Sequence, residues 1–97
     1  MSSIQKMKVS AAGFPDDPMR IKRKDFIEFE QDGEGAPTTV TVPDTLLAGG
    51  VTSCVVNAKQ ASLKVNYEIV GPNGDYTITK PASLTTTKTG GTVKVDG

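Results

Sequence analysis

Residues 61–80 read ASLKVNYEIVGPNGDYTITK, and this stretch carries the clearest structural signal in the chain. Apolar residues alternate with polar ones from Leu63 to Ile69 and again from Tyr76 to Ile78, on either side of the tetrapeptide GPNG at 71–74. Period-two alternation interrupted by a turn of Gly, Pro and Asn is the pattern of a β-hairpin with one buried face. We therefore predict two antiparallel strands joined at 71–74.

The loop length decides the register of this predicted hairpin. A four-residue loop pairs Tyr67 with Ile78 and Ile69 with Tyr76, which gathers the large apolar side chains on one face. A three-residue loop with a bulge shifts the pairing by one residue and mixes the two faces. Burial favours the four-residue loop, and it assigns both tyrosines of the chain to the core face.

The rest of the 97 residues also favours strands, and the length suits one domain. Threonine and valine, whose branched Cβ suits an extended backbone, are plentiful, and glycine and proline mark the turns. Further strands are predicted within 4–12, 19–31, 38–42, 51–56, 84–88 and 92–96. This spacing predicts an all-β fold: a single β-sandwich domain over 1–97 with about 7–8 short, mostly antiparallel strands, immunoglobulin-like or cupredoxin-like.

Two features near the N-terminus refine this prediction. The alternation fails in the middle of 19–31, so we predict a bend or β-bulge near Lys24-Asp25 that separates two half-strands. Residues 13–18 contain two prolines and two aspartates, which predicts an ordered surface loop with Phe14 tucked beneath it.

Three further expectations concern the second half of the chain. We expect at most one short helical turn, near 44–48, with Asp44 as its N-cap. The apolar run at 51–56 fits a central strand covered on both faces. Gly90-Gly91 is expected to form the turn before the last strand.

Formal charge is balanced overall but unevenly distributed. A basic run at 20–24 is followed by an acidic run at 25–34. The neutral total argues against nucleic acid as the partner, because such binding depends on a basic excess. The basic run instead supplies candidate residues for binding a protein partner: Arg20, Lys22, Arg23 and Lys24.

The acidic run resembles the spacing of a calcium loop, with carboxylates at every second position before a glycine. A calcium loop counted from Glu28 needs a glutamate at its twelfth position, where Thr39 stands. On a strand, Glu28 and Glu30 instead form the solvent face opposite Ile27 and Phe29. The segment 28–34 therefore predicts at most a weak cation site, with these candidate ligands: Glu28, Glu30, Asp32 and Glu34.

The residues needed for common catalytic sites are missing. The chain has no histidine, which removes the usual general base and most catalytic zinc and copper sites. Cys54 is the single cysteine; it lies in an apolar run and is expected to be a buried core thiol. We predict no catalytic residue, no cofactor and no enzymatic activity.

These observations lead to ranked hypotheses about function. The first is a non-catalytic module with a structural or accessory role, acting through protein–protein contacts or self-association. The alternatives are a small-ligand or glycan-binding module using the loops at 14–18 and 43–50, and the cation site at 28–34. Residues 1–14 contain no apolar signal region and no segment is long enough to span a membrane, so we expect a soluble, cytoplasmic protein.

Overall fold

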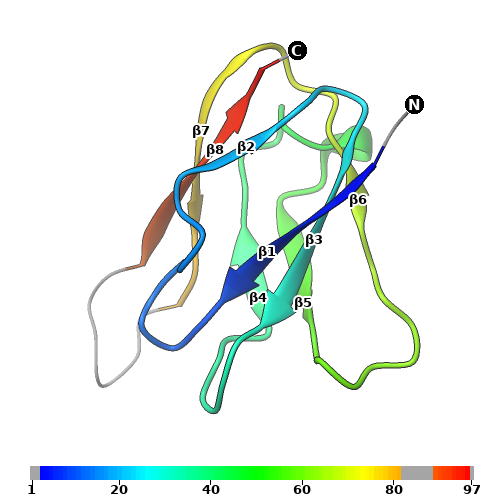
Figure 1. Ribbon diagram of the computed structural model, residues 1–97. Coiled ribbons are helices and arrows are strands. Elements are labelled where there is room, and N and C mark those ends of the chain that lie inside the picture. Colours follow the sequence, from blue (N-terminus) through cyan, green and yellow to red (C-terminus); the bar gives the residue numbers. More distant parts are fainter. Residues whose placement is uncertain (1–2, 82–88, 97) are drawn as a thin grey trace.

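The computed structural model describes residues 3–81 and 89–96, and it confirms an all-β protein. Within the described residues, helical structure is limited to one 3₁₀ turn, η1 (Ala48–Gly50). The expected strand at 84–88 lies outside the described residues. The strands are β1 (Ile4–Val9), β2 (Met19–Ile21), β3 (Phe26–Gln31), β4 (Thr39–Thr41), β5 (Ser53–Asn57), β6 (Tyr67–Glu68), β7 (Gly74–Thr79) and β8 (Gly90–Val95) (Figure 1).

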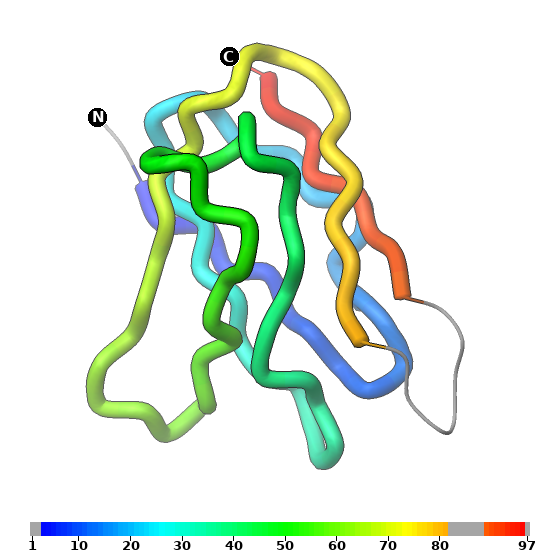
Figure 2. The backbone as a smooth tube through the Cα atoms, turned by 180° about the vertical axis from the view of Figure 1, so that it is seen from behind, coloured from blue at the N-terminus to red at the C-terminus, as the bar shows by residue number. Residues whose placement is uncertain are grey.

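The strands form one sheet that curls almost into a barrel (Figure 2). Its order is β1-β3-β5-β4-β7-β8-β2, and β6 pairs with the first residues of β3. Strand β5 joins the two halves of the sheet, because it pairs with β3 on one side and with β4 on the other. Strands β1 and β2 are therefore the two ends of the curled sheet.

The sheet is mixed, whereas mostly antiparallel strands were predicted. Strand β1 is parallel to β3, β3 is parallel to β5, and β2 is parallel to β8. Parallel neighbours need a crossover connection, and here the crossover passes through a strand in the other half of the sheet: β2 between β1 and β3, and β4 between β3 and β5. Alternation within one strand is the same for both pairings, so it could not reveal this arrangement.

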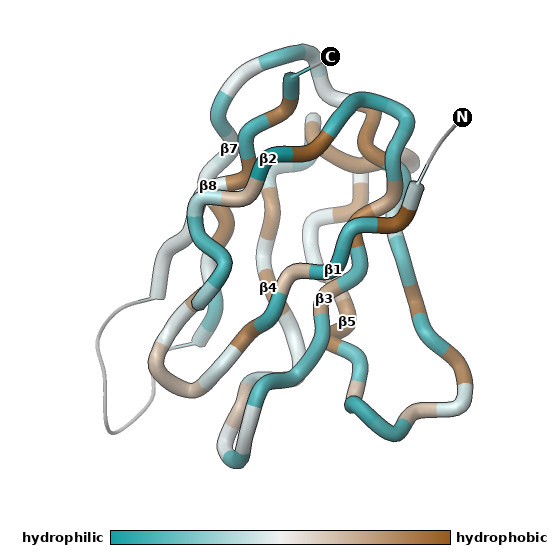
Figure 3. Tube along the Cα trace, viewed as in Figure 1, coloured by the Kyte–Doolittle hydropathy of each residue, from teal (hydrophilic) through white to brown (hydrophobic). Residues whose placement is uncertain are grey.

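Alternating residues of the strands meet in a common hydrophobic core, as the sequence predicts. Apolar and polar positions follow one another along the strands (Figure 3). Removing this apolar surface from water, at about 25 cal/mol per Å², provides the main stabilisation of the fold. The predicted inward positions that are buried include Met7, Val9, Ile27, Phe29, Val40, Val42, Val93 and Val95.

Phe14 is buried beneath its loop, which confirms that prediction, and it packs on Gly91. A Cβ added to Gly91 would lie 2.7 Å from Phe14 Cδ2, so only glycine lets the ring approach so closely. Gly90-Gly91 belongs to β8 and does not form the expected turn.

The hairpin predicted for 61–80 is wrong. Strand β6 pairs with β3, and β7 pairs with β8, with Tyr76 opposite Val93 and Ile78 opposite Gly91. Between them the chain crosses from one half of the sheet to the other, where the backbone N–H groups of Val70 and Gly71 both donate to Leu46 O. Residues 71–74 therefore belong to the connection between the two halves of the sheet, and the strands before and after it pair with β3 and β8 and not with each other.

The segment before β6 also departs from the prediction. Leu63 is 85% exposed and Val65 is 40% exposed, although both were expected on the core face. Tyr67 and Tyr76 are partly buried against the core. Their hydroxyl groups are hydrogen-bonded: Tyr67 accepts from Val55 N at 2.8 Å, and Tyr76 donates to Pro72 O at 2.6 Å.

The bend near Lys24-Asp25 is confirmed. Strand β2 ends at Ile21 and β3 begins at Phe26. Lys24 has φ +79°, a left-handed conformation that is strained for a residue with a side chain, and its N–H donates to Ile69 O at 2.8 Å. This contact ties the bend to the segment that follows β6.

Two expectations about 44–56 need correction. The helical turn lies at Ala48–Gly50, and its N-cap residue is Leu47 without a side-chain cap, so Asp44 does not cap a helix. Strand β5 is covered on one face only: Cys54 and Val56 are buried, whereas Val55 between them is 47% exposed.

Candidate functional site

The strand order leaves an open seam between β1 and β2. Each of these strands pairs on one side only, β1 with β3 and β2 with β8, among the strands that the structure describes. The two lie next to each other at the front of Figure 1 without a ladder between them. A strand with a free edge presents backbone groups that can pair with another chain. This seam is the candidate functional site.

Backbone orientation along β1 shows which groups face the seam. Val9 O accepts from Asp32 N, so the backbone groups of Val9 face β3. Lys8 N donates to Asp16 Oδ2 at 3.0 Å, so the backbone groups of Lys8 face the other side of the strand. Alternate residues of a strand direct their N–H and C=O groups to opposite sides. Ile4 and Lys6 therefore direct their backbone groups into the seam, as Lys8 does.

A cleft of about 330 Å³ opens at the upper part of this seam. Its walls come from the start of β1, from β2 and the turn that follows β2, and from the residue after β8. Arg20 and Lys22, two of the four predicted partner-binding residues, are part of the lining. The full lining is Ser3, Gln5, Arg20, Ile21, Lys22, Asp25 and Asp96.

The lining of the cleft is balanced in charge, with Arg20 and Lys22 against Asp25 and Asp96, and the neighbouring turn adds two basic residues. Arg20 pairs with Asp96 at 3.1 Å, and Asp25 is buried and accepts from Ser3 N at 3.1 Å. Lys22 and its two basic neighbours are exposed and have no ion pair within the described residues. These neighbours, Arg23 and Lys24, stand in the turn beyond the cleft, so the basic run is brought to one end of the seam.

Five residues that line this cleft were not predicted as site residues: Ser3, Gln5, Ile21, Asp25 and Asp96. Asp25 was recognised only as an interruption of the alternating face. Asp96 is brought to Arg20 by the parallel pairing of β2 with β8, a long-range contact that leaves no local pattern. The basic run was the one signal that pointed to this region.

The acidic candidates do not form one cluster. Glu28 and Glu30 lie on β3, and Asp32 and Glu34 lie in the turn beyond it. Within residues 3–81 and 89–96, no three acidic, cysteine or histidine side chains are grouped as metal ligands. A site formed by all four carboxylates is therefore not present in the described part of the chain.

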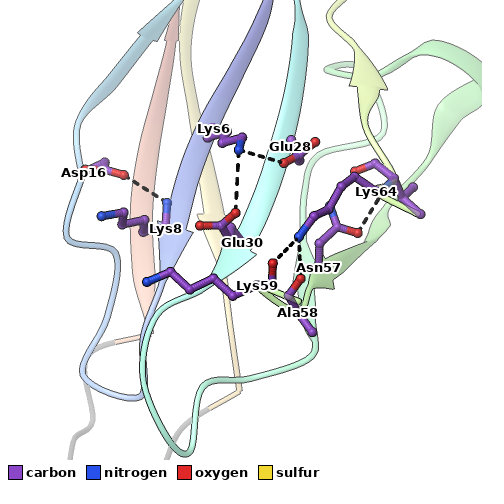
Figure 4. A network of polar contacts seen from close by, with 10 residues as sticks. Lys6, Lys8, Asp16, Glu28, Glu30, Asn57, Ala58, Lys59 and Lys64 are labelled. Carbon is purple, nitrogen blue, oxygen red and sulfur yellow. Dashed lines mark hydrogen bonds and ion pairs between the residues drawn. The ribbon is translucent and has the colours of Figure 1, made fainter. Parts of the chain in front are cut away.

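Glu28 and Glu30 are buried, although a solvent-exposed face was predicted. The parallel register sets Lys6 beside Glu28, and on the other flank β5 sets Asn57 beside Glu30. The Asn57 side chain holds the backbone of Val65 by two hydrogen bonds of 2.8 and 3.0 Å, which brings the segment before β6 alongside (Figure 4). Side chains on both flanks thus enclose the two carboxylates.

Lys6 is the counter-ion of both buried carboxylates. Its Nζ lies 4.0 Å from Glu28 Oε2 and 3.8 Å from Glu30 Oε2 (Figure 4). These separations allow Coulomb attraction but exceed the 2.7–2.9 Å of a charge-assisted hydrogen bond. Among the described residues, Glu28 Oε2 has no hydrogen-bond partner. The two carboxylates share one ammonium group, that of Lys6.

Cys54 is buried in the core, as predicted. Burial raises the pKa of its thiol to about 12, because the charged thiolate is poorly solvated there. The protonated form is neither a good nucleophile nor a metal ligand. The structure therefore gives Cys54 a packing role.

The loops at 14–18 and 43–50 lie at opposite ends of the sheet. Phe14 packs at the start of β8. Leu46 receives the chain just before β7 begins, at the end where Gly74 is paired with Val95. A single binding site that uses both loops is therefore not formed.

Comparison with known proteins adds no family assignment. The chain matches no protein-family model, and no significantly similar curated protein was found. None of the described residues forms a helix long and apolar enough to cross a membrane.

Proposed function

We propose that this protein is a non-catalytic β-module that acts through protein–protein contacts and receives an extended segment of an acidic partner in the seam between β1 and β2. The open seam is the observation that carries the proposal. Adding a strand to an exposed sheet edge gains main-chain hydrogen bonds, and neighbouring side chains then select the sequence. The role is structural or accessory, and no step of chemistry is assigned.

The charge around the seam supports an acidic partner. Lys22, Arg23 and Lys24 are exposed beside the cleft without an ion pair in the described part of the chain. Complementary charge accelerates the encounter of two proteins and suppresses wrong partners. A partner segment with Asp or Glu next to a β-forming stretch fits both features.

Strand addition is tested by blocking the edge. Proteins cross-linked to the wild type in its source cell are identified and then measured in purified binding assays. Ile4→Pro removes an N–H directed into the seam, and we expect it to abolish binding, whereas Ile4→Ala keeps this donor and keeps most of the affinity. Equal binding by both variants would exclude pairing along this part of β1.

Charge selection is tested separately. The double variant Lys22→Glu and Arg23→Glu is expected to slow association by roughly tenfold at low salt. Lys59→Glu, at an exposed lysine in the turn after β5 that does not line the cleft, is the matched control. Light scattering tests whether the partner in the seam is a second copy of this chain. A concentration-dependent dimer in the wild type that is lost in Ile4→Pro would show that the seam serves self-association.

A weak cation site is the second candidate, and the unpartnered Glu28 Oε2 supports it. Magnesium accepts one or two carboxylates with several waters, and calcium accepts more oxygen ligands. Lys6 competes for the same carboxylates, so Lys6→Ala should bind either ion more tightly than the wild type. Calorimetry that finds no binding to either protein removes this candidate.

Two finer proposals accompany this function. The division of the strands into halves joined through β5 supports a sandwich of immunoglobulin-like or cupredoxin-like type. The single cysteine, which is free and therefore suits a reducing compartment, supports a cytoplasmic location. A hollow of about 280 Å³ beside Phe14 supports the alternative of a small ligand at the 14–18 loop. A thermal-shift screen with sugars and nucleotides tests this last alternative.

A further inference from the structure

Lys80 is a buried lysine that stands directly after β7. Only 4% of the residue is exposed. Its Nζ donates to Ala11 O at 3.2 Å and to Pro81 O at 3.4 Å, and its own N–H donates to Thr89 O at 2.8 Å. Both acceptors that the described residues offer to the ammonium group are neutral carbonyls, and neither is a carboxylate.

Among the described residues, no acidic side chain forms an ion pair with Lys80. The ion pairs of the described residues involve Lys6, Arg20 and Lys94 with their acidic partners, and none involves Lys80. Residues 82–88, which follow Lys80 closely in sequence, contain no Asp or Glu. A buried charge without a counter-charge is costly, and this cost makes an external anion favourable.

Lys80 lines a cleft that could hold such an anion. The cleft has a volume of about 300 Å³, room for about ten waters at ~30 Å³ each. Thr38 and Thr39 are exposed on its wall and carry hydroxyl groups that can donate hydrogen bonds. The remaining lining is Ala11, Gly35, Ala36, Pro37 and Pro81.

We propose that this cleft binds a small oxyanion, such as phosphate or a carboxylate, through the Lys80 ammonium group and the hydroxyls of Thr38 and Thr39. The cleft shares no lining residue with the seam between β1 and β2. The site is therefore independent of the proposed protein-binding function, and either can fail alone. Glu34 precedes the lining residue Gly35 without pairing to Lys80, so its charge opposes the anion.

The test is a titration of the isotope-labelled full chain with sodium phosphate, and separately with sodium acetate, against chloride at equal ionic strength. We expect amide shifts concentrated at Thr38, Thr39 and Lys80 that saturate at millimolar anion. Lys80→Met should weaken the affinity at least tenfold, and Glu34→Gln should strengthen it about twofold. Lys94→Met, which removes a lysine already paired with Asp75, is the control and should leave the affinity unchanged.

Three outcomes would overturn the proposal. The first is shifts spread over exposed lysines without saturation. The second is equal affinity in Lys80→Met and the wild type. The third is the absence of any anion effect beyond chloride. The mapping on the wild type needs no variant, so it decides the matter even if Lys80→Met does not fold. Saturation by phosphate and not by acetate would assign the site to phosphate.

Discussion

At the scale of single residues, the buried pair Glu28 and Glu30 departs most from ordinary surface chemistry. Two carboxylates share Lys6, and Glu28 Oε2 has no hydrogen-bond donor in the described part of the chain. We expect Glu28→Gln to stabilise the protein by about 1 kcal/mol, because one of two buried charges that share a single lysine is removed while Lys6 still pairs with Glu30. Urea unfolding measures this.

The matched control for that change is Glu34→Gln, an exposed position in the turn after β3. Its effect should lie within about 0.5 kcal/mol of zero. If Glu28→Gln instead destabilises the protein, the charged carboxylate itself contributes to stability. Its hydrogen-bond donor would then come from solvent or from a partner.

Cys54 gives a prediction about pH. The pKa of its thiol is raised by burial from 9.0 to about 12, so in this range the unfolded thiol loses its proton and the folded one keeps it. The contribution of Cys54 to stability is complete below pH 9 and is lost as the pH rises toward 12. Wild type should therefore lose more stability than Cys54→Ala between pH 9 and pH 11.

A second readout follows from the same burial. A thiol reagent should leave native Cys54 unmodified at pH 8 and modify it fully in denaturant. Rapid modification of the folded protein would mean that β5 opens far more readily than its core position implies.

At the scale of elements, the fate of 61–80 explains what the sequence could reveal. Alternation identified strand-forming segments correctly at Tyr67–Glu68 and Gly74–Thr79, because it reports local fit to a half-buried sheet. It could not identify their partners, since β8 offers Tyr76 an equally suitable neighbour in Val93. Proximity in sequence favoured the hairpin, and the long-range contacts with β3 and β8 prevailed.

This difference can be measured by truncating one side chain on each side of the crossing. Leu63→Ala should cost less than about 0.5 kcal/mol because Leu63 is exposed, whereas Ile78→Ala should cost about 2–5 kcal/mol because Ile78 is buried. The predicted hairpin would have made both changes costly. A large loss of stability in Leu63→Ala would show that the Leu63 side chain is buried in the core.

The contact between Phe14 and Gly91 links a loop to a strand. Gly91→Ala places a methyl group 2.7 Å from the Phe14 ring, and we expect a loss of about 1–3 kcal/mol from overpacking. Adding Phe14→Leu should recover part of this loss, and a double-mutant cycle measures the coupling. Additive effects of the two changes would show that positions 14 and 91 are not coupled, so the loss in Gly91→Ala would not come from a clash with the Phe14 ring.

At the scale of the whole molecule, the candidate site depends on closure of the sheet. The basic run at 20–24 was visible in the sequence, but its position at an open seam follows from the strand order, which no local pattern encodes. The same holds for Lys80, which a sequence shows as one lysine among many. Its ammonium group binds Ala11 O, and the cleft that it lines is completed by residues 35–39, which are distant from both in the chain.

The open seam predicts a pattern of amide exchange along β1. N–H groups of Ile4 and Lys6 face the seam, so they should exchange with solvent faster than those of Gln5 and Met7, which face β3. Hydrogen exchange followed by NMR resolves these four amides. Equal protection along the strand would mean that the seam is closed in solution, by β2 or by a second molecule.

The connection between β1 and β2 gives the seam a further property. These strands are consecutive in the chain and yet occupy the two ends of the strand order, so residues 10–18 span the gap that hydrogen bonds leave open. The two edge strands are thus joined by the polypeptide chain at one end of the seam and are not joined at the other end. An inserted segment can separate the two edges only as far as this nine-residue link allows.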